Sequence, residues 1–361
     1  MSAFDTAIAG FLSDGTVCHG MTRRIAVLAH GGFPDDAKTA TGILRYADAE
    51  VVAVLDREIA EADPDARVAD YHPDVADAPI VASSAAAPAF DALAIGIAPI
   101  GGGFDESWRT DVIDAIESGA DVVSGLHYFL GDDPEFARLA GEHGVELWDV
   151  RRPPDDLTVS EAIARELDTE IVATVGTDCS VGKMTTTREL YEAAVDRGVD
   201  AGFIPTGQTG IIVEDWGIPV DRTVSDFTAG AVERMLRERS DRDYLFVEGQ
   251  GSITHPAYSP VTLGILHGAM PDSLVLCHEA GRDRIHGYES VEIPNPGYVA
   301  GLYESLAESV APTEVVAGAL NTAHLDAEGA AAARDRYRSQ LTVPVADPIR
   351  DGVDELLEAV L

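Results

Sequence analysis

The segment GTDCSVGKMT, residues 176–185, has the residue types of a loop that binds phosphate groups. In such loops a glycine is followed by four residues, Gly-Lys and a Ser or Thr. Successive backbone amides hold the phosphate oxygens, the lysine neutralises them, and the hydroxyl binds Mg²⁺. Here five residues separate Gly176 from Gly182, and Met184 occupies the position of the hydroxyl. The pattern therefore predicts a phosphate-binding loop whose metal position is altered.

The elements around this loop support the interpretation. The sequence TEIVATV before it has the pattern of a strand, and GKMTTTRELYEAAVDRG after it has that of a helix. The amides of residues 177–183 should therefore converge at a helix N-terminus, where unpaired N–H groups and the helix dipole attract anions. We expect the ligand to contact the loop residues Gly176, Thr177, Asp178, Cys179, Ser180, Val181, Gly182, Lys183, Met184 and Thr185.

A second strand, YLFVEGQGS, ends at Glu248 and continues into Gly249 and Gly251. In nucleotide hydrolases an acidic residue at the end of such a strand contacts Mg²⁺ directly or through water. The two glycines allow the backbone to approach a ligand closely, so we include them among the ligand-binding residues. If the reaction requires Mg²⁺, Glu248 and Thr185 are the expected metal ligands; otherwise we expect no metal.

Short apolar runs alternate with helical patterns on both sides of the loop. Alternation of this kind predicts an α/β fold, in which helices cover both faces of a parallel sheet. The expected strands lie at residues 24–30, 51–56, 92–98, 121–126 and 145–150, and then at 170–175, 201–204, 243–247, 273–277 and 314–319.

The segment RRPPDD, residues 151–156, marks the expected domain boundary, because paired prolines fix φ and remove two N–H donors. We expect a three-layer Rossmann-like domain over residues 24–152 and a three-layer domain like those of P-loop NTPases over residues 153–361. Residues 1–23 precede the first clean strand, and we expect them to form a disordered tail.

The charge of the chain disfavours some classes of partner. Its formal charge is −38, from 63 acidic and 25 basic residues. Self-repulsion of that size disfavours nucleic acid and anionic membrane surfaces, so we expect a small-molecule substrate. Lys38 and Lys183 are the only lysines in the sequence. Acid-rich, lysine-poor surfaces suit a salt-saturated cytoplasm, where the Debye length is about 3 Å at 1 M salt, and this favours a halophilic protein.

The cysteines and the apolar runs bear on the compartment. Cys18, Cys179 and Cys277 form neither an even set nor a close pair, which argues against a disulfide framework and against a zinc site. No run reaches the ~18 to 20 apolar residues that span a membrane, and residues 1–20 lack the pattern of a signal peptide. We expect a cytoplasmic protein. Paired Rossmann-like domains often associate, so a homo-oligomer remains open.

The motifs GTDCSVGK and VEGQG together resemble dethiobiotin synthetase and its relatives, whose loop also has five residues between the glycines. This resemblance accounts for the unusual spacing. Those relatives carry the metal-binding Thr directly after the Lys, whereas this chain has Met184 there. The nearest hydroxyls are those of Thr185 and Thr186, which lie about 100° and 200° further round the helix.

Longer motifs resemble a P-loop family long catalogued as a domain of unknown function, in which a Rossmann-like domain precedes the P-loop domain. They are GFIPTGQTGIIVEDWGIPVDRTVSDFTAG, VEGQGSITHPAYSPVTLGILHG, LVLCHEAGR and AKTATGILRY, and the resemblance extends from about residue 24 to the end. Some relatives are D-glutamate N-acetyltransferases. The resemblance implies transfer of acetyl from acetyl-CoA to the amino group of an acidic amino acid, D-glutamate in particular. Coenzyme A carries phosphates that must be held without phosphoryl transfer, which is compatible with the altered loop.

Attack of an amine on a thioester needs a general base and donors that stabilise the oxyanion. Four histidines, His255, His267, His278 and His286, lie within about 30 residues of sequence, and histidine is the usual base near neutral pH. We expect His255 to be the base, followed by His278 with its neighbour Glu279. Glu248 is a further catalytic candidate because it ends a strand near the loop. Ser252 and Thr254 could serve the oxyanion.

A glutamate substrate has two carboxylates, so the implied site needs forked cations. The sequence EAGRDRIHG supplies Arg282 and Arg284 just after a strand. Gln208 and Thr209, at another expected strand end, and Ser252 are the further substrate-binding candidates.

Two other functions remain open. An ATP/Mg²⁺-dependent ligase or kinase of the dethiobiotin synthetase type is favoured by Glu248 and the loop spacing, and disfavoured by Met184. A non-catalytic, nucleotide-binding regulator fits the loop but gives the histidines and arginines no role.

Overall fold

The computed structural model of the protein describes residues 23–99 and 101–361, and its chain forms two units. The first unit contains the described chain up to Pro153 together with Gln208–Pro219, and the second contains Pro154–Gly207 and Val220–Leu361. The expected tail, residues 1–23, lies outside the described residues except for Arg23. The division after Pro153 falls in the proline-rich segment, as the sequence predicts. The sequence also placed Gln208–Pro219 in the second domain, whereas in the structure this segment belongs to the first unit.

The first unit contains a parallel sheet of six strands in the order β3-β2-β1-β4-β5-β6. Its strands are β1 (Arg24–Leu28), β2 (Glu50–Leu55), β3 (Ile80–Val81), β4 (Ala92–Ile95), β5 (Asp121–Ser124) and β6 (Leu147–Asp149). Its helices are α1 (Lys38–Tyr46), α2 (Arg57–Ala62), α3 (Val68–Tyr71), α4 (Arg109–Glu117), α5 (Pro134–His143) and α7 (Gln208–Glu214). This strand order is that of Rossmann folds.

Helix α7 belongs to the first unit because of its apolar side chains. Ile211 and Ile212 are buried in the same core as the strand residues Ile25 and Leu93, and α7 packs against α1. The chain therefore leaves the second unit after Gly207 and returns to it at Val220.

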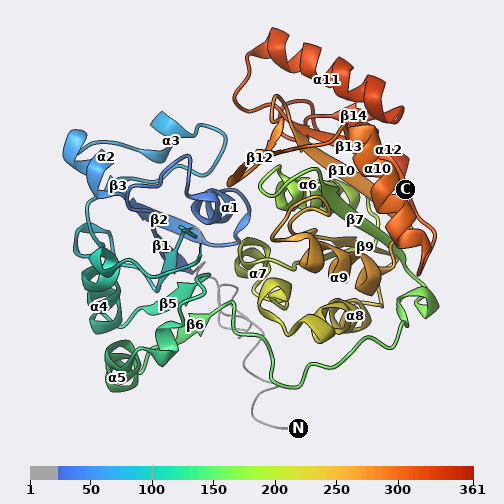
Figure 1. The fold of residues 1–361 in the computed structure, drawn as a ribbon. Helices are drawn as coiled ribbons and strands as arrows, with labels where there is room; N and C mark the ends of the chain where they lie inside the picture. Colours follow the sequence, from blue (N-terminus) through green and yellow to red (C-terminus); the bar gives the residue numbers. More distant parts are fainter. Residues whose placement is uncertain (1–22, 100) are drawn as a thin grey trace. The chain divides into compact units, whose positions relative to one another are not determined.

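The second unit contains another parallel sheet of six strands, in the order β14-β13-β10-β7-β9-β8, and a separate two-stranded sheet (Figure 1). Its strands are β7 (Glu170–Gly176), β8 (Ala201–Ile204), β9 (Tyr244–Val247), β10 (Ser273–Glu279), β13 (Glu314–Asn321) and β14 (Val345–Ala346), with β11 (Arg284–Ile285) and β12 (Tyr288–Glu292) forming the antiparallel pair. Its helices are α6 (Lys183–Asp196), α8 (Thr228–Glu238), α9 (Ser259–Ala269), α10 (Pro296–Glu308), α11 (Ala327–Leu341) and α12 (Asp354–Val360).

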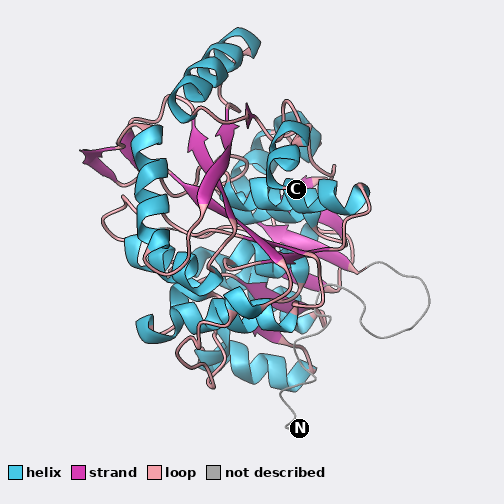
Figure 2. Ribbon diagram, turned by 90° about the vertical axis from the view of Figure 1, so that its right-hand side faces the viewer, coloured by secondary structure: helices cyan, strands magenta, loops and turns pink. Residues whose placement is uncertain are grey.

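Helices cover both faces of this second sheet. Val275 and Cys277 of β10 pack in one core with residues of α6 and α12. Their neighbours Leu274 and Leu276 are equally buried and point to the opposite face, because side chains alternate along a strand. Figure 2 shows the strands flanked by helices. Two α/β units with parallel six-stranded sheets confirm the predicted fold class.

Within the described residues, no helix combines the length and the apolar character that crossing a bilayer requires.

Candidate functional site

The loop between β7 and α6 has the backbone conformation that a phosphate cradle needs. Gly176 ends β7, and Ser180 and Gly182 adopt positive φ angles of 58° and 99° before the helix begins at Lys183. The Lys183 side chain is buried and folds back over the loop, so that its ammonium donates to the Asp178 carbonyl at 2.8 Å. Burial lowers the pKa of Lys183 from its ordinary value. A bound phosphate group would give this buried ammonium an anionic partner.

Two glycines, Gly176 and Gly249, lie so close to the Lys183 side chain that a larger residue would not fit. A Cβ atom on Gly176 would lie 2.9 Å from the Lys183 Nζ atom. A Cβ atom on Gly249 would lie 1.9 Å from the Thr174 carbonyl oxygen and 3.4 Å from the Lys183 Cδ atom. At Gly251 the φ angle of 63° also favours glycine. Side chains at Gly176 and Gly249 would fill or distort the space around the lysine, whereas one at Gly251 would meet Tyr258 and Thr262.

The loop is held in place by the segment that follows β10. The Asp178 carboxylate accepts hydrogen bonds from the backbone N–H of Cys179 at 2.7 Å and of His286 at 2.8 Å. The Arg282 guanidinium donates to the Cys179 carbonyl at 2.9 Å and to Glu279 at 2.5 Å, and lies 3.5 Å from Asp178. Arg282 and Glu279 thus fix the cradle.

The metal position of an ordinary P-loop is replaced in this chain. Met184 is half-buried where a metal-binding hydroxyl would stand. The next hydroxyl, that of Thr185, is half-buried, and Thr187 is bonded to the Lys183 carbonyl at 2.7 Å. Met184 offers only a thioether, which is a poor ligand for Mg²⁺. The loop residues fit a phosphate group better than they fit a Mg²⁺ ion.

Glu248, at the end of β9, is fully enclosed. One carboxylate oxygen accepts the backbone N–H groups of Thr206 and Gly207, both at 3.1 Å, and the other accepts the Gln250 amide at 3.0 Å. Burial raises the pKa of Glu248 to about 7, against the opposing effect of these hydrogen bonds. A carboxyl group that is partly protonated at neutral pH is a weak metal ligand.

His255 lies in the loop after β9 and is 1% exposed. Its Nδ1 atom accepts the backbone N–H groups of Ala257 at 3.1 Å and Tyr258 at 3.2 Å, so the ring proton must sit on Nε2. Burial lowers the pKa of His255, which keeps the ring neutral. The Nε2 atom is buried without a hydrogen-bond partner among the described residues. His255 is therefore arranged to donate a hydrogen bond, whereas the sequence favoured it as the general base.

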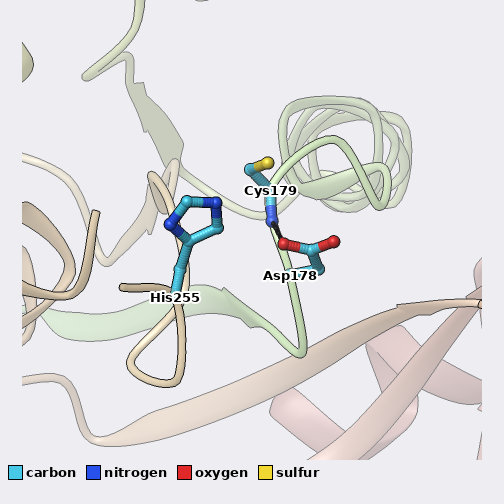
Figure 3. Close-up of side chains that lie close together, drawn as sticks. All are labelled: Asp178, Cys179 and His255. Atoms are coloured by element: carbon cyan, nitrogen blue, oxygen red, sulfur yellow. Dashed lines mark hydrogen bonds between the residues drawn. The ribbon is translucent and has the colours of Figure 1, made fainter. Parts of the chain in front are cut away.

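Figure 3 shows Asp178, Cys179 and His255, three residues of the types that bind metal ions. One potential ligand atom of each lies within 4.8 Å of the others. Their chemistry does not fit a metal ion. Coordination through the Nε2 atom of His255 would require the proton to move to Nδ1, where two backbone N–H groups already donate. The Asp178 carboxylate is likewise occupied by backbone N–H groups.

His278 stands near the end of β10, beside the loop. Its Nδ1 atom lies 2.8 Å from the Thr177 hydroxyl, and its ring stacks on Tyr337 with centroids 5.2 Å apart. Burial, followed by the charge of Arg282, lowers the pKa of His278 to about 4, so the ring is neutral at neutral pH. If Nδ1 donates to Thr177, Nε2 carries a free lone pair and can accept a proton.

The remaining predicted residues are spread over several environments. The Ser252 hydroxyl lies 3.0 Å from that of Thr254, and Thr254 donates to the Thr177 carbonyl at 3.3 Å, so both are next to the loop. Arg284 pairs instead with Glu292 across the β11-β12 hairpin at 3.1 Å. Gln208 and Thr209 lie in the first unit, where the Thr209 hydroxyl is 2.9 Å from that of Thr39. His267 is bonded to the Leu306 carbonyl in the helical layer.

The carboxyl ends of the strands in the first sheet also carry a cluster of polar side chains. Its centre is Asp111 on α4, whose carboxylate lies 3.0 Å from the Nε2 atom of His30, accepts the Ser84 N–H at 2.8 Å and contacts the Arg57 guanidinium. The Nδ1 atom of His30 accepts the Arg57 N–H at 3.2 Å. Burial alone would raise the pKa of Asp111, but the hydrogen bonds from His30 and Ser84 outweigh it and hold that pKa below its ordinary value.

The sequence and the fold are similar to known proteins. Residues 158–357 match the family described as a domain of unknown function (DUF1611_C), P-loop domain, and residues 61–153 match the domain of unknown function (DUF1611_N), Rossmann-like domain. A curated protein from Tritonibacter scottomollicae, named D-glutamate N-acetyltransferase, is 35% identical over 269 residues, 74% of this chain and 80% of that protein. One from a Pseudoalteromonas species with the same name is 35% identical over 264 residues, 73% of this chain and 79% of that protein.

A solved structure matches most of the chain. The crystal structure of a DUF1611 family protein from Anabaena variabilis superimposes with a TM-score of 0.88 and 39% sequence identity, covering 94% of this chain and 99% of that one.

Proposed function

The chain belongs to the DUF1611 family, and from this membership we propose that it is an N-acetyltransferase that moves the acetyl group of acetyl-CoA to the amino group of D-glutamate. Two relatives with that acceptor in their names are 35% identical over about three quarters of the chain. The observation that carries the proposal is the loop itself, which combines a buried lysine with Met184 at the metal position.

In this proposal the loop holds the phosphates of coenzyme A. The backbone N–H groups of residues 181–183, at the N-terminus of α6, and the Lys183 ammonium supply donors for a pyrophosphate. The N–H groups of Thr177 and Cys179 are already bonded to the Cys277 carbonyl and the Asp178 carboxylate. Phosphate binding would also relieve the unfavourable burial of that ammonium. Because no phosphoryl group is transferred, the Mg²⁺ ligand that Met184 replaces is not needed.

In this reaction the amine nitrogen bonds to the thioester carbonyl carbon and the C–S bond breaks. The nitrogen loses one proton to a general base, and the departing thiolate sulfur gains one proton. The Nε2–H group of His255, a buried donor without a partner among the described residues, suits the tetrahedral oxyanion. His278 is the neutral ring beside the loop that can accept the proton once the attacking nitrogen has become acidic. Its low pKa makes it a weak base, and a bound dicarboxylate would raise that pKa.

The direct test is turnover with D-glutamate and acetyl-CoA in molar KCl, because the charge of −38 is poorly screened at low ionic strength. We expect CoA release in step with N-acetyl-D-glutamate, undiminished by EDTA, and no ADP when ATP is supplied. Turnover that depends on Mg²⁺ and releases ADP or phosphate would instead indicate an ATP-dependent ligase, with Glu248 and Thr185 as its metal site.

A binding measurement tests the role of the loop separately. Lys183→Ala should weaken acetyl-CoA binding about 10- to 100-fold, since a charge-assisted hydrogen bond contributes about 1.5 to 3 kcal/mol. Lys38→Ala, which removes the exposed lysine of the first unit, is the control and should leave the dissociation constant unchanged. Calorimetric titration measures these dissociation constants. Equal values for the wild type, Lys183→Ala and Lys38→Ala would contradict a role of the loop in phosphate binding.

A further inference from the structure

A pocket of about 310 Å³ opens at the carboxyl ends of β10 and β13 in the second unit. Its lining residues come from those strands, the segments after β10 and β12, and helices α10 and α11. Figure 1 labels these strands and helices. Its polar lining consists of His278, Arg282, Asp283, Asn295, Arg336 and Gln340. The pocket adjoins the phosphate-binding loop, because Arg282 also bonds to Cys179 and His278 to Thr177.

One of these residues differs from its neighbours on the same helix. In α11, Arg334 pairs with Asp351 and Arg338 pairs with Glu355. Arg336, between them, lines the pocket, and its guanidinium makes no ion pair with any residue the structure describes. The chain has 63 acidic residues and 25 basic ones, so most arginines have an acidic residue within reach. An arginine that lines a pocket without such a partner is available to an anionic ligand.

The charges of the lining complement a dicarboxylic amino acid. Arg282 has N–H groups beyond those it donates to Glu279, Asp178 and Cys179, because a guanidinium has five. Arg336 offers a second planar fork, and forked donors match carboxylates in geometry. Asp283 is the acidic group on the lining and suits an ammonium. Two cations and one anion thus face a ligand that has two carboxylates and one ammonium.

We propose that this pocket binds the amino-acid acceptor, with Arg336 and Arg282 holding its two carboxylates and His278 facing its amine. The inference rests on the proposed function, since it assigns a place to the acceptor of the same reaction. It also changes the predicted pair of cations, because Arg284 is engaged with Glu292 and Arg336 takes its place.

Kinetics of matched arginine variants test the proposal. Arg336→Ala should raise KM for D-glutamate about 10- to 100-fold and leave KM for acetyl-CoA within about twofold. Arg338→Ala, two residues away on the same helix, removes an arginine that faces Glu355 and should change neither value. D-glutamine, which lacks the side-chain carboxylate, should lose little with Arg336→Ala if Arg336 binds that carboxylate. Equal effects of Arg336→Ala and Arg338→Ala on KM for D-glutamate would overturn the proposal.

Direct binding separates failure of this proposal from failure of the proposed function. Calorimetric titration of the full chain with D-glutamate needs no acetyl transfer. Binding that Arg336→Ala weakens and Arg338→Ala does not supports the pocket, even if acetyl-CoA proves not to be the donor. Turnover by the wild type with an unchanged KM in Arg336→Ala would retain the transferase and reject this pocket. Absence of D-glutamate binding to the wild type, with and without CoA, would reject the pocket as an acceptor site.

Discussion

The carboxyl edges of the two six-stranded sheets both gather histidine, arginine and acidic side chains, but they use them differently. At the edge of the first sheet, both ring nitrogens of His30 and both carboxylate oxygens of Asp111 are bonded to other groups. At the edge of the second sheet, the Nε2 atom of His255 has no hydrogen-bond partner, and the guanidinium of Arg336 no ion pair, among the described residues. Polar groups that satisfy one another stabilise a fold, whereas open ones are available to a ligand. We infer a structural role for the first cluster and a binding role for the second.

The strongest test of this contrast removes the centre of the first cluster. Asp111→Ala leaves His30 and Arg57 without their partner, and breaking a buried pair costs about 3 to 5 kcal/mol. We expect that loss in the free energy of unfolding measured in urea, with an unchanged dissociation constant for acetyl-CoA. Glu117→Ala, an exposed change on the same helix, is the control. If Asp111→Ala instead loses acetyl-CoA binding and keeps the stability of the wild type, the first cluster has a binding role and not a structural one.

A somewhat smaller effect is expected from His255→Asn. Asparagine can still accept the N–H groups that His255 receives at Nδ1, but it lacks the donor at the position of Nε2. Removal of one oxyanion donor lowers kcat about 100- to 1000-fold, which corresponds to about 2.7 to 4 kcal/mol. KM should change little. The control His267→Asn alters a histidine bonded to the Leu306 carbonyl and should retain kcat.

The shape of the pH profile distinguishes a donor from a base at this position. If His255 only donates, the dependence of kcat/KM on pH should keep the same acid limb in His255→Asn as in the wild type. Disappearance of that limb would identify His255 as the general base, as the sequence suggested.

The smallest effect we expect concerns stability and pH. The folded pKa of Glu248 is raised to about 7, so between about pH 4.5 and 7 the folded state binds more protons than the unfolded state. Stability therefore falls as pH rises through this interval. Glu248→Gln lacks this loss, so its free energy of unfolding should rise relative to that of the wild type by about 2 to 3 kcal/mol between pH 5 and pH 8, since each unit of pKa shift corresponds to about 1.4 kcal/mol. Asp111, whose pKa is lowered, should act in the opposite direction and lose its contribution as pH falls.

Urea unfolding at pH 5 and pH 8 measures this difference between the wild type and Glu248→Gln. A constant difference across the interval would mean that Glu248 titrates near its ordinary pKa and is not enclosed as described.

The fold was largely predictable because parallel strands are buried on both faces and read as continuous apolar runs. The expected strand at 201–204 coincides with β8, and the expected strand at 170–175 is one residue shorter than β7. The strands β3 and β14 have two residues each, too few to show a pattern. Helix α7 was assigned to the wrong unit, because its apolar residues do not indicate which core they enter.

The candidate site was predictable where chemistry and spacing coincide along the chain, as in the loop and at Glu248. Arg336 was missed because it lies in an ordinary-looking helix, AEGAAAARDRYRSQL, where nothing local separates it from Arg334 and Arg338. Only the folded chain shows that those two have acidic partners. The tautomer of His255 was equally out of reach, since it depends on backbone N–H groups whose direction the sequence does not specify.

The return of Gln208–Pro219 to the first unit means that the chain passes between the units three times. A polypeptide limited to residues 154–361 would carry Ile211 and Ile212 without the core that covers them. Such a fragment would expose an apolar helix and be prone to aggregate. One cut at the proline-rich segment therefore does not separate the two units, because it leaves residues Gln208–Pro219 of the first unit on the fragment that carries the second.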